Sequence, residues 1–218
     1  MNLEQARFNM VEQQVRTWEV LDPRVLSVME ATPREAFVPP SHERLAYADL
    51  EIPLGHGKSM MRPNVEGRML QALEIQPSDV ALEVGTGSGF VTACLAKLAA
   101  HVESVDLHQD FTQAARRRLR AQALFNVTLQ SGNAAAGWTG QHPKYDVIAL
   151  TASMARYRSL FEKQLNVGGR LFVVVGEAPV MEARLVTRLG EQGFTHQRLF
   201  ETCLKPLVGL EARPRFIF

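Results

Sequence analysis

Residues 82–90 read Leu82-Glu83-Val84-Gly85-Thr86-Gly87-Ser88-Gly89-Phe90, and this stretch decides the fold. It ends the apolar run 80–84, which suits a buried strand, and it opens a run with helical spacing at 90–99. The three glycines let the chain turn sharply and let main-chain amides approach a ligand, because no Cβ stands in the way. The stretch therefore predicts a strand, a ligand-binding turn and a helix, in that order.

The same alternation of strand and helix continues along the chain. We expect strands at 102–106, 126–130, 145–150 and 170–175, and helices at 64–74, 109–123 and 157–165. The tail offers a strand or helix at 181–189 and β-like segments at 194–202 and 214–218. This order predicts an α/β protein with a Rossmann-like, doubly wound and mostly parallel sheet, whose ligand lies beyond the carboxyl ends of the strands.

The first 63 residues differ from this pattern. Helical spacing at 2–16 and 23–31 is followed at 33–63 by a stretch rich in proline and glycine, which we expect to be mostly irregular. A loop of that length is often laid over a cleft. We therefore divide one compact unit into 1–63, the N-terminal helices and a substrate-covering loop, and 64–218, a cofactor-binding core.

Composition excludes several classes of protein. Lys and Arg number 24 against 23 Asp and Glu, so no overall field favours nucleic acid or an anionic membrane. No apolar run approaches the roughly 18 residues that a membrane span needs, and the first residues do not resemble a signal peptide. The cysteines, Cys94 and Cys203, form no ligand motif. We expect a cytoplasmic monomer without a metal site, a nucleic-acid partner or a membrane partner.

The glycine turn distinguishes between two cofactors. The dinucleotide fingerprint Gly-x-Gly-x-x-Gly would place its third glycine at position 90, where this chain has Phe90. An acid two residues before a Gly-x-Gly-x-Gly turn is instead the usual form in Rossmann-like methyltransferases that use S-adenosylmethionine, and Glu83 to Gly89 resembles it. A nicotinamide enzyme remains the less favoured alternative.

Further residues fit an adenosyl group. Asp106 ends the next expected strand, where a carboxylate can accept hydrogen bonds from both ribose hydroxyls, although it could also cap the following helix. Leu107 would then lie against the adenine. The amide of Asn133, after another expected strand, could read the adenine edge as donor and acceptor, or could serve a plain turn.

With these pieces in place, the chain resembles the protein-L-isoaspartate O-methyltransferases. The matches run from about residue 7 to 176 and include two strings outside the general methyltransferase turn. These strings are Pro33-Arg34-Glu35-Ala36-Phe37-Val38-Pro39 and Pro53-Leu54-Gly55-His56-Gly57. The resemblance implies a seven-stranded sheet with an N-terminal helical cover, and methyl transfer to an L-isoaspartyl carboxylate of a damaged protein. That reaction needs positioning more than acid–base catalysis, because the sulfonium activates the methyl group and the carboxylate is already ionised.

Departures from the family pattern fall mainly on the acceptor side. Where members read Gly-Gln-Thr-Ile-Ser-Gln-Pro, this chain reads Gly57-Lys58-Ser59-Met60-Met61-Arg62-Pro63, so Met61 replaces the serine associated with catalysis. Lys58 and Arg62 could hold an anionic acceptor or could be solvated loop residues, and Ser59 could lend the missing hydroxyl. The family's Gly-Asp-Gly appears as Gly132-Asn133-Ala134, and its Phe-Val-Pro-Leu appears only as Pro206-Leu207-Val208-Gly209-Leu210.

Three functions remain open from the sequence: a methyltransferase acting on isoaspartyl protein or on another carboxylate acceptor, a cofactor-binding homologue without that turnover, and a nicotinamide enzyme. The candidate site follows from the first. The candidate cofactor-binding residues, for S-adenosylmethionine and its product S-adenosylhomocysteine, are Glu83, Gly85, Thr86, Gly87, Ser88, Asp106, Leu107, Asn133, Ala134 and Thr151. The candidate acceptor-side residues are His56, Lys58 and Arg62, with Ser59 and Met61 at the catalytic position.

Overall fold

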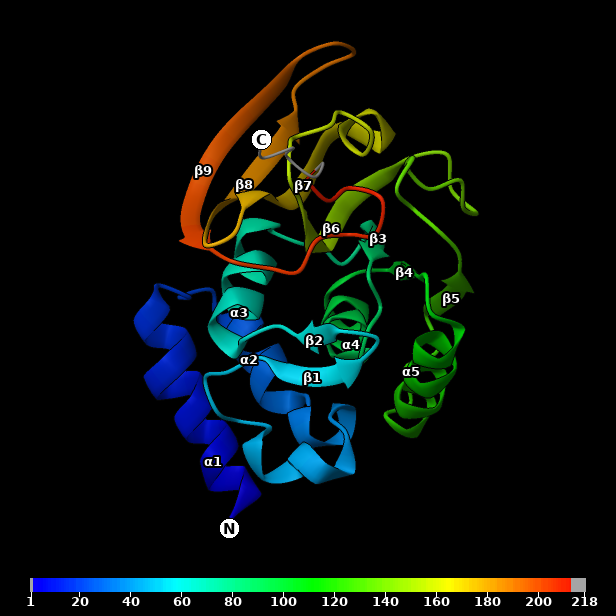
Figure 1. Cartoon of the computed structure of the whole chain (residues 1–218). Coiled ribbons are helices and arrows are strands. Elements are labelled where there is room, and N and C mark those ends of the chain that lie inside the picture. Colours follow the sequence, from blue (N-terminus) through cyan, green and yellow to red (C-terminus); the bar gives the residue numbers. More distant parts are fainter. Residues whose placement is uncertain (1, 213–218) are drawn as a thin grey trace, which may run out of the picture.

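Seven strands form one sheet in the order β5-β4-β3-β6-β7-β8-β9 in the computed structural model, which describes residues 2–212 (Figure 1). The strands from β3 to β7 run parallel, and β8 and β9 are antiparallel to their neighbours. Their bounds are β3 Val80–Val84, β4 His101–Asp106, β5 Val127–Ser131, β6 Tyr145–Met154, β7 Leu165–Glu177, β8 Val180–Arg188 and β9 Phe194–Thr202. The predicted mostly parallel, Rossmann-like sheet of seven strands is confirmed.

The core helices agree with the sequence pattern except at one place. The helices α3 Pro63–Ala72, α4 Phe90–Leu98 and α5 Gln109–Ala121 form where helical spacing was found. The helix expected at 157–165 is wrong, because the structure has only a short 3-10 turn there, Glu162–Gln164. Strand β6 extends to Met154, and strand β7 begins at Leu165. The connection between them is therefore too short for a packed helix. The segment 181–189 is part of a strand, and 214–218 lies outside the described residues.

The N-terminal helices pack against the core and cover its lower part in Figure 1. They are α1 Leu3–Asn9, which continues into a π-helical stretch Met10–Val15 and a 3-10 turn Arg16–Trp18, and α2 Pro23–Ala31. Val15 comes so close to α3 that a Cβ added at Gly67 would lie 2.7 Å from it. Met10, Val15 and Met29 share one buried cluster with α3 and α4. No helix among residues 2–212 has the length and hydrophobicity that crossing a membrane requires.

The stretch 33–63 is more ordered than its prolines and glycines indicated. Two 3-10 turns, Arg34–Phe37 and Pro40–Leu45, are followed by a hairpin of β1 Ile52–Gly55 and β2 Lys58–Met60. Gly55, His56 and Gly57 at its tip all have positive φ, the backbone conformation that a tight hairpin turn requires. The expectation of a mostly irregular loop is therefore wrong here, since the same glycines that marked a loop close a hairpin.

A buried carboxylate lies directly beneath the glycine turn. Glu83 on β3 is inaccessible to solvent, and its Oε2 accepts hydrogen bonds from the hydroxyls of Thr92 on α4 and Ser104 on β4. Burial raises the pKa of Glu83 to about 8, against the opposing effect of the two hydroxyl donors. Near pH 7 the group is therefore mainly protonated, and it links three elements as a neutral hydrogen-bonding group.

The protonation of Glu83 predicts a pH-dependent stability. From about pH 4.5, its ordinary value, to about pH 8, the folded chain binds more protons at Glu83 than the unfolded chain does. The free energy of unfolding should therefore fall as pH rises through this range, by up to about 1.4 kcal/mol per pH unit from this group. The Glu83→Gln variant keeps a neutral group of similar shape and should lose less stability between pH 5 and 8 in urea titrations. Parallel curves for the two proteins would contradict the assignment.

Candidate active site

The glycine turn and the acid of the next strand meet through the main chain. The register of β3 and β4 places Val84 opposite Val105, so the Gly85 amide donates to the Val105 carbonyl at 2.8 Å. The Gly87 amide then donates to Oδ2 of Asp106 at 2.8 Å. The hydroxyl of Thr151, on the other neighbouring strand, donates to the Gly85 carbonyl at 2.7 Å. Three adjacent parallel strands thus hold the turn at their carboxyl ends.

Asp106 is held by backbone donors on both of its oxygens. Besides the Gly87 contact, Oδ1 accepts the His108 amide at 2.9 Å, which shows that the residue also shapes the entry into α5. The side chain is largely buried but lines the cleft, and a carboxylate oxygen has more than one acceptor site. The N-cap residue of α5 is His108, so Asp106 does not itself cap that helix, as the sequence allowed. Its carboxylate lines the cleft and accepts the His108 amide just before the helix begins.

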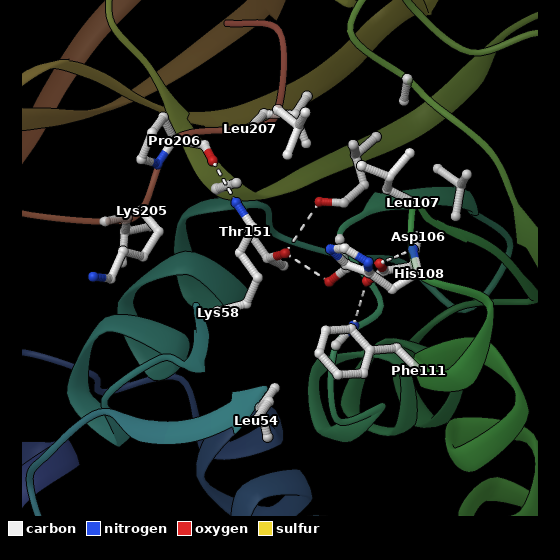
Figure 2. Close-up of a pocket in the computed structure, with 18 of the residues that line it drawn as sticks. Leu54, Lys58, Asp106, Leu107, His108, Phe111, Thr151, Lys205, Pro206 and Leu207 are labelled. Atoms are coloured by element: carbon white, nitrogen blue, oxygen red, sulfur yellow. Dashed lines mark hydrogen bonds between the residues drawn. The ribbon is translucent and has the colours of Figure 1, made fainter. Parts of the chain in front are cut away.

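A cleft of about 800 Å³, counting the part open to solvent, extends from this point. In Figure 2, Asp106, Leu107, His108 and Phe111 lie on one side of the cleft, and Lys58 and Lys205 lie on the other. Of the candidate residues from the sequence, the cleft brings together Lys58, Ser59, Met61, Gly85, Gly87, Asp106, Leu107, Asn133, Ala134 and Thr151.

Leu107 and Asn133, the two residues that we expect on the adenine side, both line the cleft. Leu107 exposes 41% of its surface, which is unusual for a leucine beside a buried strand end. The side-chain oxygen of Asn133 accepts the Ala135 amide at 2.9 Å, so the residue does serve a turn while it lines the cleft. An exposed apolar surface next to a side-chain amide suits a flat, polar-edged ring.

Five candidate residues lie outside this cleft. Glu83, Thr86 and Ser88 are buried on the inner side of the turn, where they line a small cavity and support the backbone rather than face the main cleft. His56 does not line the cleft, and its Nε2 lies 3.0 Å from Oδ2 of Asp110. Arg62 lines a neighbouring cavity that shares Lys205 and Pro206 with the first.

The β1–β2 hairpin and the residues after it form the wall opposite the turn. Lys58 donates from Nζ to the carbonyl of Pro206 at 3.1 Å, which joins the hairpin to the C-terminal segment. Ser59 lines the cleft beside it, and Met61 is 5% exposed at the boundary of the main cleft and the smaller cavity beneath the turn. The Met61 side chain therefore fills space at the position where the family resemblance leads us to expect a hydroxyl.

A buried ion pair holds the backbone at Met61. Arg34 and Glu66 are both inaccessible to solvent and form a direct salt bridge, while Arg34 donates from Nη2 to the Met61 carbonyl at 2.6 Å. The guanidinium also lies 4.8 Å from the ring centre of Phe90, the first residue of α4. Burial raises the pKa of Glu66 to about 7, an effect that the charge of Arg34 opposes. Through this pair, the 3-10 turn at 34–37 connects the acceptor-side loop to the helix after the glycine turn.

Sequence reasoning missed much of the wall that comes from the C-terminal segment. Ser153, near the end of β6, donates its hydroxyl to the Leu204 carbonyl at 2.8 Å, and its amide donates to the Lys205 carbonyl at 2.9 Å. These bonds bring Leu204, Lys205, Pro206, Leu207 and Val208 to the cleft. The segment was recognised only as a weak match to a family motif, and no local pattern indicated where it would pack. His108 and Phe111 were missed because their places follow from the start of α5.

Comparison with known proteins agrees with this geometry. The family model for protein-L-isoaspartate(D-aspartate) O-methyltransferase (PCMT) matches residues 5–212. The chain is 36% identical over 211 residues to protein-L-isoaspartate O-methyltransferase 2 of Pelobacter propionicus, covering 96% of this chain and 93% of that protein. It is also 36% identical over 203 residues to a protein-L-isoaspartate O-methyltransferase of Rhodopseudomonas palustris, with 93% of each chain covered.

Solved structures share the fold at lower identity. A Plasmodium falciparum structure, described as a protein-L-isoaspartate O-methyltransferase in complex with S-adenosyl-L-homocysteine, superposes with a TM-score of 0.79. It has 18% identity and covers 95% of this chain and 98% of its own. A second structure, named protein-L-isoaspartate O-methyltransferase, has a TM-score of 0.78 at 20% identity and covers 92% of this chain and 65% of its own. At this identity the likeness establishes the fold.

The predicted family is therefore confirmed by a match over nearly the whole chain, and the predicted enzyme class, an S-adenosylmethionine-dependent methyltransferase, is confirmed with it. The strings around residues 33–39 and 53–57, together with the glycine turn, are the parts of the sequence that indicated this relationship. The chain belongs to the protein-L-isoaspartate O-methyltransferase family.

Proposed function

We propose that this chain transfers the methyl group of S-adenosylmethionine to a carboxylate, in the first place that of an L-isoaspartyl residue in a damaged protein. One observation carries the proposal: the Asp106 carboxylate lies 2.8 Å from the Gly87 amide, in a cleft whose opposite wall bears Lys58 and Ser59. A cofactor side and an acceptor side thus face each other across one space. The two bacterial relatives described above are named protein-L-isoaspartate O-methyltransferases, after this activity.

On the cofactor side, each residue has a defined role in the proposal. Asp106 accepts the ribose hydroxyls with the acceptor sites that the Gly87 and His108 amides leave. Leu107 packs on the adenine, and the Asn133 amide contacts its edge. The turn at 85–89 lies against the methionine part of the cofactor, with Glu83, Thr86 and Ser88 supporting the turn from its inner side.

On the acceptor side, the reaction requires mainly that the carboxylate, the methyl group and the sulfur are aligned. The bond from sulfur to the methyl carbon breaks as a carboxylate oxygen bonds to that carbon, leaving a neutral thioether and a methyl ester. No proton moves, so the chain needs no general base. Lys58 attracts and orients the carboxylate by charge, Lys205 adds to the field, and the Ser59 hydroxyl is available as a donor.

A polypeptide acceptor fits better than a small one because of the second cavity. That cavity is lined by Arg62, Trp18 and Val180 and shares Glu51, Leu204, Lys205 and Pro206 with the main cleft. Chain flanking an isoaspartyl residue can lie there, which gives Arg62 an acceptor-side role away from the reacting atoms. The segment before α3 then acts as the substrate-covering part of residues 1–63.

A second function is favoured by one observation, the buried methionine at the serine position. If Met61 excludes the isoaspartyl geometry, the chain is a cofactor-binding homologue that serves another carboxylate acceptor or has lost turnover. A cytoplasmic location, a monomeric state and the absence of nucleic-acid and membrane partners stay predictions from the sequence.

The first test is the activity itself. We expect the chain to methylate an isoaspartyl peptide and not the matching aspartyl peptide, with a kcat well below that of a family member that has the serine. Incorporation of the labelled methyl group from S-adenosylmethionine measures both. No incorporation into the peptide, together with labelling of a different acceptor in a cell extract, would establish the second function instead.

The cofactor side is tested by Asp106→Asn. Loss of a charged acceptor for two ribose hydroxyls should weaken S-adenosylmethionine binding about tenfold to a hundredfold, the equivalent of about 1.5–3 kcal/mol. Isothermal titration calorimetry measures the change, and Glu83→Gln, which alters a carboxyl on the inner side of the turn, is the matched control with a smaller expected effect. Equal affinity of Asp106→Asn and wild type for S-adenosylmethionine would show that Asp106 does not bind the ribose.

The acceptor side is tested by Met61→Ser. Restoring a hydroxyl should raise kcat for an isoaspartyl peptide, while truncating a buried methionine should destabilise the fold by about 2–5 kcal/mol. Met60→Ser is the matched control, because Met60 is equally buried but does not line the main cleft. It should lose similar stability and gain no activity. A gain in both variants, or in neither, would show that the side chain at 61 does not limit turnover.

A further inference from the structure

The hairpin tip meets the start of α5 beside the cleft, at side chains to which the proposed methyl transfer gives no role. His56 lies in the turn between β1 and β2, His108 immediately precedes α5, and Asp110 lies in its first turn. His56 Nε2 is 3.0 Å from Asp110 Oδ2, and the two imidazole rings stack with their centres 4.0 Å apart. One possible ligand atom from each of the three residues lies within 4.8 Å of the other two.

One feature of this cluster is not explained by packing alone. The Nε2 atom of His108 is buried and has no hydrogen-bond partner among residues 2–212, which is rare for a buried ring nitrogen and is costly in water-excluded surroundings. The two-residue turn of the hairpin gives His56 a φ of +51°. A backbone held in this form brings a second imidazole directly over the first.

Two imidazoles and a carboxylate are ligands that divalent transition metals prefer. We propose that His56, His108 and Asp110 form a binding site for a divalent transition-metal ion such as Zn²⁺, which joins the β1–β2 hairpin to the start of α5. Neither the charge balance nor any sequence spacing indicated it, because His56 and His108 lie far apart along the chain.

Binding requires one small rearrangement. A metal ion lies in the plane of the ring that holds it, and the two rings are nearly parallel, at 7° to each other. One ring must therefore turn out of the stack. The side chain of His56 is 45% exposed at the hairpin tip, and the terminal torsion of histidine is broad, so this ring turns at little cost. The side chain of Asp110 is 65% exposed and can follow.

The position of the proposed metal site links it to the two walls of the cleft. The hairpin carries Lys58 and Ser59, while α5 begins just after Asp106 and Leu107. A metal ion between them holds the acceptor wall against the cofactor wall. Metal binding itself does not depend on the proposed methyl transfer, so the two proposals can fail separately.

The test is Zn²⁺ binding by the full chain without a histidine tag, measured against a chromophoric chelator. We expect one ion per chain, with affinity lowered at least tenfold in each of His56→Gln, His108→Gln and Asp110→Asn. The matched control His42→Gln changes a histidine in the 3-10 turn Pro40–Leu45, outside the proposed site, and this variant should bind Zn²⁺ as wild type does. Circular dichroism spectra confirm that each variant is folded, and Asp110→Asn changes only an exposed side chain.

A second readout identifies the ligands. Co²⁺ should give visible absorption bands of low-symmetry nitrogen and oxygen coordination with wild type and His42→Gln, and these bands should disappear with Asp110→Asn and His108→Gln. Equal Zn²⁺ affinity in wild type and the three ligand variants, or no stoichiometric binding by wild type, would overturn the proposal. Loss of the bands in the His42 control would do so as well, because it would place the ion elsewhere.

Discussion

The contact on which the site depends is the hydrogen bond from the Gly87 amide to the Asp106 carboxylate, and it requires a bend that side chains cannot enter. A Cβ at Gly85 would lie 2.3 Å from Oγ1 of Thr151, and one at Gly89 would lie 2.9 Å from the Cβ of Ala115. Both residues also have positive φ. Because β3 and β4 run parallel in a fixed register, the bend and the acid reach the same edge of the sheet, and the cofactor side of the cleft follows from the backbone.

Buried polar groups beneath the glycine turn connect the elements that form the two walls of the cleft. Glu83 joins β3, β4 and α4 as a neutral acid, and the Arg34–Glu66 pair joins the 3-10 turn Arg34–Phe37 to α3 and to the backbone at Met61. Breaking a buried ion pair by removing one partner typically destabilises a protein by about 3–5 kcal/mol, since the other charge stays buried. These groups therefore support the alignment on which a reaction without a general base relies.

The acceptor side is assembled from segments that are distant in the sequence. The hairpin contributes Lys58, and the segment after β9 contributes Lys205 and Pro206 through its bonds to Ser153. In the sequence, each of these residues is an ordinary surface type. Only the packing of the C-terminal segment on β6 brings them into one wall of the cleft, and the Met61 side chain lies at the boundary of this cleft and a smaller cavity.

The sequence by itself determined the order of strands and helices in the core, the glycine turn, the family and the identity of the acid at the end of β4. These features depend on local periodicity and on residue types whose conformations are restricted, such as the glycines at 85–89. The tertiary structure decided that residues 52–60 form a hairpin, that 157–165 is not a helix, and that His56 contacts Asp110 and His108. It also decided where residues 204–208 lie. Such contacts join distant parts of the chain. A local sequence pattern cannot predict them, because it does not indicate which distant surface will bury a given side chain.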